Sequence, residues 1–130
     1  MTHDSKVGVV KVLINGHVVC ESHIPTNTQA TSNGFKTVLG ADADKTAFFD
    51  GMMDEVRLWK EVRSPAMIRA HMSSINSVSG HEMDLLAYWK FDEGKGSTCV
   101  DTSSNNHDLL LGGGKKASMP VFVHSTAPIS

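Results

Sequence analysis

The stretch FFDGMMDEVRLW, residues 48–59, decides the fold of this chain. From Met53 onward it has the alternation of a β-strand, and side chains two apart on a strand share one face. Asp54 therefore shares a face with the apolar Val56 and Leu58. A carboxylate in that position is a metal ligand, a catalytic acid or a structural hydrogen-bond acceptor, and the three alternatives lead to different proteins.

Length and composition fit one globular domain with a core of ordinary size. The chain has 130 residues, of which 40% are hydrophobic and 20% charged, and its formal net charge is -2. Lysine and arginine are scattered, so the sequence offers no basic surface for nucleic acid. No apolar run approaches the ~20 residues of a membrane span, and the N-terminus lacks the pattern of a signal peptide. As written, the sequence predicts a cytosolic chain without membrane insertion, unless it is a piece of an exported protein.

The two cysteines, Cys20 and Cys99, lie far apart and lack the CxxC spacing of a zinc or redox site. They are either two free thiols or one disulfide. We favour free, buried thiols, because an unpaired cysteine is among the most buried residue types.

The first half of the chain reads as strands and turns followed by one helix. In VVKVLINGHVVCES, Asn15-Gly16 predicts a two-residue hairpin turn between strands near 7–14 and 17–23. A polar loop and a short strand FKTVLG, residues 35–40, follow. FFD and MMDEVRLWK continue as strand with a bend at the intervening glycine. Ser64-Pro65 then begins a short helix over 65–73.

The second half returns to strand periodicity. DLLAYWKFD places Leu85, Ala87, Trp89 and Phe91 on one face, where the aromatic rings anchor the core. STCV, LLLG and SMPVFVHS are further short strands separated by turns. Many short strands, frequent turns and a single helix predict an all-β sandwich.

The order of these segments resembles a known family. The segments are INGHVV, then VLGADAD followed by FFDGMMDEVRLWKEVRSPAMIRAHM, then LLAYWKFDEGKGSTCVDTSSNNHDLLLGG. Over residues 9–128 they are similar to the C-terminal part of a laminin-G-like jelly-roll domain of the concanavalin-A-like lectin/glucanase superfamily. The resemblance implies a single domain over residues 1–130 and an antiparallel jelly-roll β-sandwich. It also implies a non-catalytic module that binds carbohydrate or protein, in a family that is usually extracellular.

One part of the family pattern is missing. Family domains begin with further strands that build much of the first sheet, and nothing before Val7 supplies them. The chain is then an excerpt of a longer domain, a compact variant, or one half of an oligomer in which two copies complete each other's sheets. Open strand edges and an exposed apolar face are unfavourable unless they are covered. For that reason we expect a homodimer.

A glycosidase would need two carboxylates about 5 to 9 Å apart, able to flank one glycosidic bond. On a strand, acids at i and i+2 or i+4 meet this requirement. Asp54 and Glu55 are adjacent and point to opposite faces, and Gly51 interrupts the strand between Asp50 and Asp54. The sequence therefore predicts no catalytic residue, and a glycoside hydrolase fragment is a minor alternative.

Two turn segments carry oxygen ligands of the kind that calcium takes. ADADKT contains Asp42 and Asp44, and VDTSSNNHD contains Asp101, Ser103, Asn105 and Asp108. The same residue types are also what turns are made of, because they bond their own backbone and tolerate left-handed conformations. Both interpretations stay open: a calcium ion at the rim of the sandwich, as related domains often have, or plain turns with no cofactor.

Four residues are predicted to have structural roles: Gly16 in the hairpin turn, Trp89 and Phe91 in the core, and Asp54 as a buried acceptor. An ionised carboxylate on an apolar face needs hydrogen-bond donors. Backbone N–H groups near the glycine at position 51, or in the turn of FDEGKG, are the expected donors. Function then lies in rim loops that bind a ligand, or in strand edges that pair with another copy.

Overall fold

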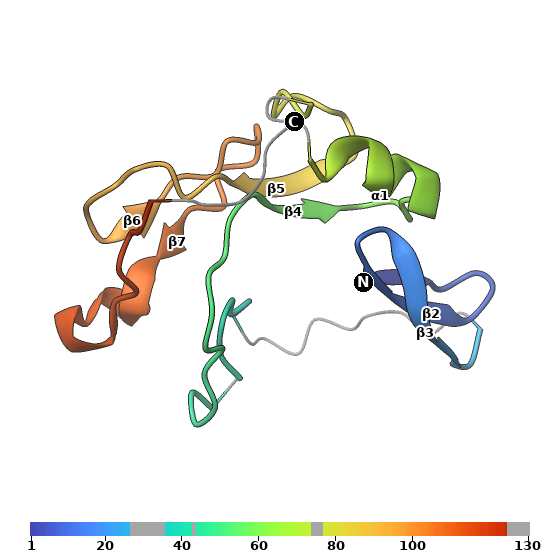
Figure 1. The fold of residues 1–130 in the computed structure, drawn as a ribbon, viewed down its shortest axis with the longest axis horizontal. Coiled ribbons are helices and arrows are strands. Elements are labelled where there is room, and N and C mark those ends of the chain that lie inside the picture. The colour runs from blue at the N-terminus through green and yellow to red at the C-terminus, as the bar shows by residue number, and fades with distance from the viewer. Residues whose placement is uncertain (27–35, 43, 74–76, 125–130) are drawn as a thin grey trace.

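The computed structural model describes residues 1–26, 36–42, 44–73 and 77–124. In these residues the strands form three antiparallel sheets, accompanied by one α-helix and two short 3₁₀ turns. Figure 1 shows the β1–β2–β3 sheet at one end, the β4–β5 sheet with helix α1 in the middle, and the β6–β7 sheet at the other end. A mostly β chain with one short helix is thereby confirmed, while the assembly of its sheets into a two-layer jelly roll stays a prediction.

The predicted hairpin is confirmed. Strand β2, Val9–Ile14, pairs with β3, His17–His23. Between them Asn15 has φ 51° and Gly16 has φ 73°, the two positive angles that a type I′ turn requires and that Asn-Gly adopts at little cost. The register shifts between Val12 and Leu13, so that Val19 of β3 is an extra residue and forms a bulge.

A strand before Val7 was not expected, and the structure corrects this. Strand β1, Thr2–Asp4, pairs antiparallel with β2, so the sheet order is β1–β2–β3. The turn that joins them uses Gly8 at φ 67°, and the Asp4 carboxylate accepts a hydrogen bond from the Lys6 amide at 3.0 Å. With three residues, β1 is too short for period-two alternation to reveal it.

The β4–β5 sheet holds the core. Strand β4, Val56–Trp59, pairs with β5, Leu85–Trp89. Leu58 lies opposite Ala87 and Trp59 lies opposite Leu85, which leaves Leu86 as an extra residue on β5. This bulge reverses the alternation, because it adds one residue to a pattern of period two.

The core is therefore divided between the two faces of β5. Ala87 and Trp89 pack with Cys99 and Leu111 in one cluster, whereas Leu85 and Tyr88 pack with Val78 in another. The expectation that Leu85 shares a face with Ala87 and Trp89 is wrong for this reason.

Phe91 contributes to the first cluster from beyond the end of β5. It has φ 58° and is half-buried against the Trp89 side of the core. Phe91 therefore packs against the core from outside the strand.

Helix α1, Pro65–His71, confirms the predicted helix and ends two residues before the expected boundary. Ser64 caps it, because the hydroxyl accepts a hydrogen bond from the Met67 amide at 3.2 Å. Arg69 then joins α1 to the hairpin: its Nη1 donates to the carbonyl of Gly16 at 2.8 Å. A Cβ at Gly16 would lie 2.2 Å from Cγ of Arg69, so only glycine leaves room for this contact.

The remaining elements are short. Strand β6, Thr98–Cys99, pairs with β7, Leu109–Leu110, and two 3₁₀ turns follow, η1 over Leu111–Gly114 and η2 over Lys116–Ser118. Three expected strands are wrong where they are described: residues 36–40, 48–50 and 119–124 contain no strand. A single bridge between Ala41 and Phe48 is what remains of the expected pairing there.

Candidate functional site

Asp54 does not have the role that alternation predicted for it. It is exposed and lies before β4, and nothing in the described part of the chain donates a hydrogen bond to its carboxylate. The reason is the backbone of Glu55, whose φ of 52° lies in the left-handed region. A residue in that conformation interrupts the pleat, so face assignments do not carry across it.

Glu55 has the structural role instead. Its Oε2 accepts hydrogen bonds from Nη2 of Arg57 at 2.5 Å and from the hydroxyl of Tyr88. Arg57 also donates through Nη1 to the backbone carbonyl of His71 at 3.1 Å, and its guanidinium lies 4.8 Å from the centroid of the Tyr88 ring. The Glu55–Arg57–Tyr88 cluster therefore links β4 to β5 and to the C-terminal end of α1.

The electrostatics of the cluster favour a charged arginine and a neutral tyrosine. Burial opposes the charge on Arg57, but hydrogen bonds to Tyr88 and Glu55 outweigh it and raise the pKa of the guanidinium. Burial and the nearby Glu55 carboxylate raise the pKa of the Tyr88 hydroxyl, against the opposing effect of Arg57. A charged Arg57–Glu55 pair with a neutral Tyr88 hydroxyl as a further donor is a charge-assisted hydrogen-bond arrangement that holds the two strands together.

Glu55 and Arg57 of this cluster line a groove of about 300 Å³ between β4 and α1, here called the β4–α1 groove. Its residues include charged, aromatic and thioether side chains: Glu55, Arg57, Trp59, Arg63, Met67, Ile68, His71, Met72, Ser77, Val78 and Glu82. Arg63 covers the ring of Trp59, with 3.6 Å between the guanidinium carbon and the ring centroid, and donates to Asp84 at 2.7 Å. Met67 and Met72 are 40% and 54% exposed, so the α1 wall of the groove is open to solvent.

The second acidic residue of the groove, Glu82, also makes structural hydrogen bonds. Its carboxylate accepts hydrogen bonds from the amides of Ser79 at 2.8 Å and Gly80 at 3.1 Å. Slight burial opposes ionisation, but these bonds outweigh it and lower the pKa of Glu82. Neither acid of the groove is free to act as a general acid or a nucleophile without breaking these bonds.

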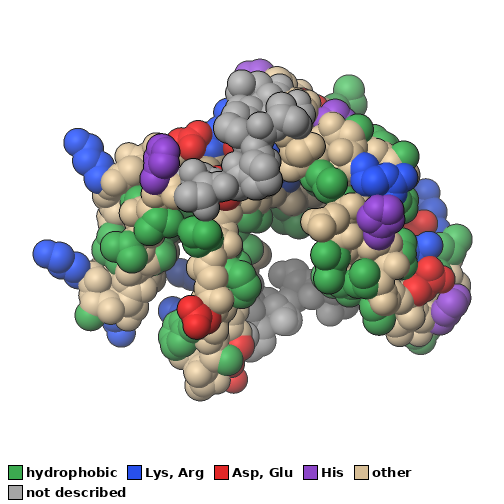
Figure 2. Space-filling model, viewed as in Figure 1, with side chains coloured by type: hydrophobic (Ala, Val, Ile, Leu, Met, Phe, Trp, Pro, Cys, Tyr) green, Lys and Arg blue, Asp and Glu red, His purple; other side chains and the backbone are tan. Residues whose placement is uncertain are grey.

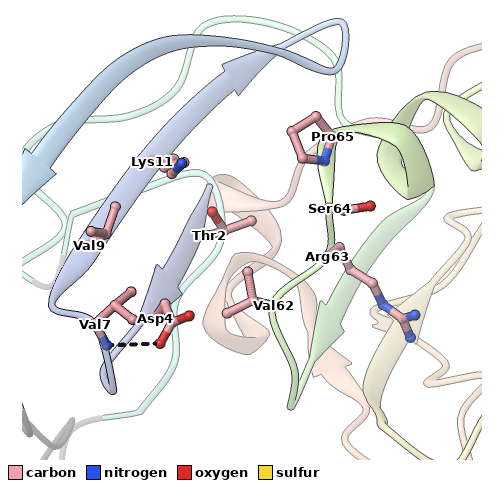
Figure 3. A pocket seen from close by; sticks show the side chains of 9 residues that line it. All are labelled: Thr2, Asp4, Val7, Val9, Lys11, Val62, Arg63, Ser64 and Pro65. Atoms are coloured by element: carbon pink, nitrogen blue, oxygen red, sulfur yellow. Dashed lines mark hydrogen bonds between the residues drawn. The ribbon is translucent and has the colours of Figure 1, made fainter.

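A smaller cleft of about 200 Å³ lies between the β1–β2–β3 sheet and the segment that leads into α1. Figure 3 shows the two walls, one formed by Thr2, Asp4, Val7, Val9 and Lys11 and the other by Val62, Arg63, Ser64 and Pro65. The Asp4 carboxylate accepts from the Val7 amide at 3.3 Å. This cleft separates the β1–β2–β3 sheet from the segment at residues 62–65.

The loop predicted to bind calcium is closed around Asp101, which is 5% exposed. One carboxylate oxygen accepts from the amides of Tyr88 and Ser103 at 2.9 and 2.8 Å. The other accepts from the hydroxyl of Ser103 and the amide of His107, both at 2.8 Å. Burial opposes ionisation of Asp101, but hydrogen bonds from Tyr88, His107 and Ser103 outweigh it and hold the pKa below its usual 3.8.

The other predicted calcium ligands also make internal bonds or stand apart. Asp108 accepts from the Asp101 amide at 2.9 Å, and Asn105 donates to the Leu85 carbonyl at 2.9 Å. Asp42 accepts from Thr46 and Ala47 within its own turn, and Asp44 is exposed. Across the described ranges, no three His, Cys, Asp or Glu side chains gather where they could hold a metal ion. These contacts are those of turns, and calcium binding stays a prediction.

The two cysteines are free, as predicted, but differ in burial. Cys99 is fully buried, and burial raises the pKa of its thiol to about 11. Cys20 is exposed on β3, so the prediction that both thiols are buried is wrong for this one.

Comparison with known proteins places the chain in a family. A family model described as concanavalin A-like lectin/glucanases superfamily, of the laminin G type, matches residues 1–69, so the chain belongs to this superfamily. The match contains the hairpin and the 48–59 stretch that suggested the resemblance. No curated protein and no solved structure matches the chain. Among the described residues, no helix is long and apolar enough to cross a membrane.

Sequence reasoning missed Glu55 and the groove. The available signal was an acid two residues before an arginine, Glu55 and Arg57, which on an unbroken strand indicates a same-face ion pair. Tyr88, which completes the cluster, lies 31 residues beyond Arg57, and its face is reversed by the bulge on β5. That reversal has no signal in the local sequence.

Proposed function

We propose that the chain is a non-catalytic binding module that recognises a protein through the β4–α1 groove. The observation that carries this proposal is the set of side chains in that groove. Trp59, Met67, Met72, Arg57 and Arg63 belong to the aromatic, methionine and arginine types that are enriched at protein interfaces. Methionine in particular adapts its shape to different partners.

A non-catalytic role is supported by the hydrogen bonds that the acidic side chains already accept within the protein. Glu55, Glu82 and Asp101 each accept hydrogen bonds from neighbouring protein groups. Hydrolysis of a glycosidic bond needs two carboxylates that flank the bond, with one of them available to protonate it. A glycoside hydrolase fragment remains the minor alternative.

A protein ligand is favoured over a glycan because the aromatic ring of the groove is already covered. Sugar rings stack on open aromatic faces, whereas Arg63 lies over Trp59. The rim loop at residues 44–50 offers a different surface, since Phe48 and Phe49 are 68% and 56% exposed there. Glycan recognition, if it occurs, belongs to that loop.

A peptide library displayed on phage tests the protein proposal directly. Peptides selected on the wild-type chain are expected to bind Met72→Glu at least tenfold more weakly, because the change introduces a charge into the groove. Met83→Glu is the matched control, since Met83 is 94% exposed and lies outside the groove. Selected peptides that bind both variants equally, or a failure to enrich any peptide, would contradict the proposal.

A glycan array probed with the wild type, Met72→Glu, Met83→Glu and Phe48→Ala distinguishes glycan recognition by the rim loop from peptide recognition by the groove. Binding of a glycan that Phe48→Ala abolishes and Met72→Glu leaves unchanged would show that the rim loop, rather than the groove, is the recognition surface. The absence of glycan binding together with selected peptides would support the groove.

A second candidate function, assembly with another copy, is supported by the exposed surface. The chain exposes 9788 Å², whereas a folded monomer of its 14.0 kDa is expected to expose about 6,700 Å². Figure 2 shows hydrophobic side chains at the surface across this view. We propose that a partner covers part of this excess, of about 3,000 Å², and completes a two-layer jelly-roll sandwich.

A further inference from the structure

We infer that two copies of this chain pack against each other through one face of the β1–β2–β3 sheet. The inference rests on the second candidate function, assembly, and names its surface. We call this surface the outer sheet face and define it by Val10, Val12 and Ile14 of β2 together with Cys20 of β3.

Strand pairing and alternation place these residues together. Val10, Val12 and Ile14 are two apart on β2, and Cys20 lies directly opposite Val12. Val12 and Ile14 are 40% and 61% exposed, and Cys20 is exposed as well. The bulge lies on β3, so the alternation along β2 is unbroken.

The two faces of the sheet differ in charge. The opposite face holds Thr2, Val9 and Lys11, which line the cleft against Val62 (Figure 3). Lys11 forms an ion pair with Glu21 at 3.1 Å on that inner side. A sheet with one buried face normally turns its apolar side chains toward the core. Here the face toward the chain's own body holds the charged pair beside Val9, whereas the outer sheet face exposes Val12 and Ile14.

A second copy fits this face for two reasons. Its β2 row is aliphatic, and the register adds His3, Ser22 and His17 but no Lys, Arg, Asp or Glu, so that a two-fold axis brings like surface onto like surface without opposing carboxylate or ammonium groups. The exposed surface of the whole chain also allows such a contact, because its excess of about 3,000 Å² is larger than the roughly 800 Å² that a standard interface removes per partner. Two such sheets packed face to face, about 10 Å apart, form the two layers of a sandwich.

Sedimentation velocity on the full chain tests the inference with a matched pair of variants. Ile14→Asp changes a residue that is 61% exposed on the outer sheet face, and Leu110→Asp changes one that is 60% exposed on β7. The wild type and Leu110→Asp are expected to be dimers. Ile14→Asp is expected to dissociate at least tenfold more readily, with an unchanged far-UV circular dichroism spectrum.

Cross-linking of the wild type provides a readout that does not depend on a folded variant. Cys99 is fully buried, so a bifunctional maleimide is expected to react at Cys20 and to join two chains across the outer sheet face. The cross-linked dimer should be absent in Cys20→Ser.

The outcomes separate the inference from the functions that precede it. A monomeric wild type overturns both the inference and the assembly function and leaves the groove proposal standing. A dimer that survives Ile14→Asp and yields no Cys20 cross-link overturns the outer sheet face as the contact and leaves assembly intact. A dimer that Ile14→Asp dissociates, with a Cys20 cross-link in the wild type, supports the inference.

Discussion

At the scale of single residues, the backbone angle of Glu55 decides which of two neighbouring acids is structural. Asp54 is exposed, whereas Glu55 bonds to Arg57 and Tyr88. A non-glycine residue at positive φ is tolerated when its surroundings over-determine it, and these two bonds supply that constraint. The acid that alternation placed in the core is therefore the dispensable one.

Alanine at each position tests this assignment. Glu55→Ala leaves the Tyr88 hydroxyl and the Arg57 charge without their acceptor, and should lower the free energy of unfolding by about 2 kcal/mol. Asp54→Ala should change it by less than about 0.5 kcal/mol, as is usual for surface substitutions. Urea unfolding followed by tryptophan fluorescence measures both values. Equal destabilisation by the two variants would contradict the assignment.

Asp101 should make stability depend on pH. Its pKa is lowered below 3.8 in the folded chain, so its contribution is present above the unfolded value and is lost as pH falls through the folded value. At neutral pH we expect Asp101→Asn to cost about 2 kcal/mol, because the amide cannot accept all four bonds. The difference from wild type should shrink as pH is lowered below 3.8.

Urea unfolding at a series of pH values measures this difference, with Asp54→Asn as the control. Asp54 has no donor within the described residues, so its variant should follow the wild type at every pH. A destabilisation by Asp101→Asn that is independent of pH would show that the ionised carboxylate is not what the loop requires.

At the scale of elements, the contact between α1 and the hairpin turn depends on glycine for two separate reasons. Gly16 has φ 73°, and a Cβ there would meet Arg69 at 2.2 Å. Gly94 has a similar φ of 66°, but a Cβ there would meet no atom within 4 Å. The two glycines therefore separate the cost of backbone strain from the cost of displacing Arg69.

Gly94→Ala should lower the free energy of unfolding by about 1 kcal/mol, the cost of a left-handed conformation for an L-residue. Gly16→Ala should cost at least about 1 kcal/mol more, because Arg69 must move and its bond to the turn is lost. Chemical denaturation of both variants gives the comparison. If both variants lose the same stability, the contact with Arg69 adds nothing.

Elements that neighbouring residues specify could be predicted from the sequence. Asn15-Gly16 specified the hairpin, and Ser64-Pro65 specified the start of α1, because the turn and the cap are chemistry of adjacent residues. The bulge at Leu86 and the positive φ of Glu55 depend on how distant strands meet. Each of them reverses or interrupts a face, and for this reason the site could not be predicted from alternation.

At the scale of the whole molecule, the chain buries little of its apolar surface. Among the described residues its core consists of two small clusters on the faces of β5, while large side chains such as Ile14, Phe48 and Leu110 are more than half exposed. Stability in such a chain depends on what covers that surface, because burial of apolar area is the dominant favourable term in folding. Association and folding should therefore be coupled.

Coupling of this kind makes the melting temperature depend on protein concentration. Unfolding of a dimer releases two chains, so dilution favours the unfolded state by mass action. A tenfold increase in concentration is worth about 1.4 kcal/mol per dimer, and should raise the melting temperature by about 3 °C for a chain of this size. Differential scanning calorimetry across a hundredfold range of concentration measures the effect. Ile14→Asp should melt at a lower temperature that does not change with concentration, whereas Leu110→Asp should follow the wild type. A wild-type melting temperature that is independent of concentration would mean that the outer sheet face is stable without a second copy covering it.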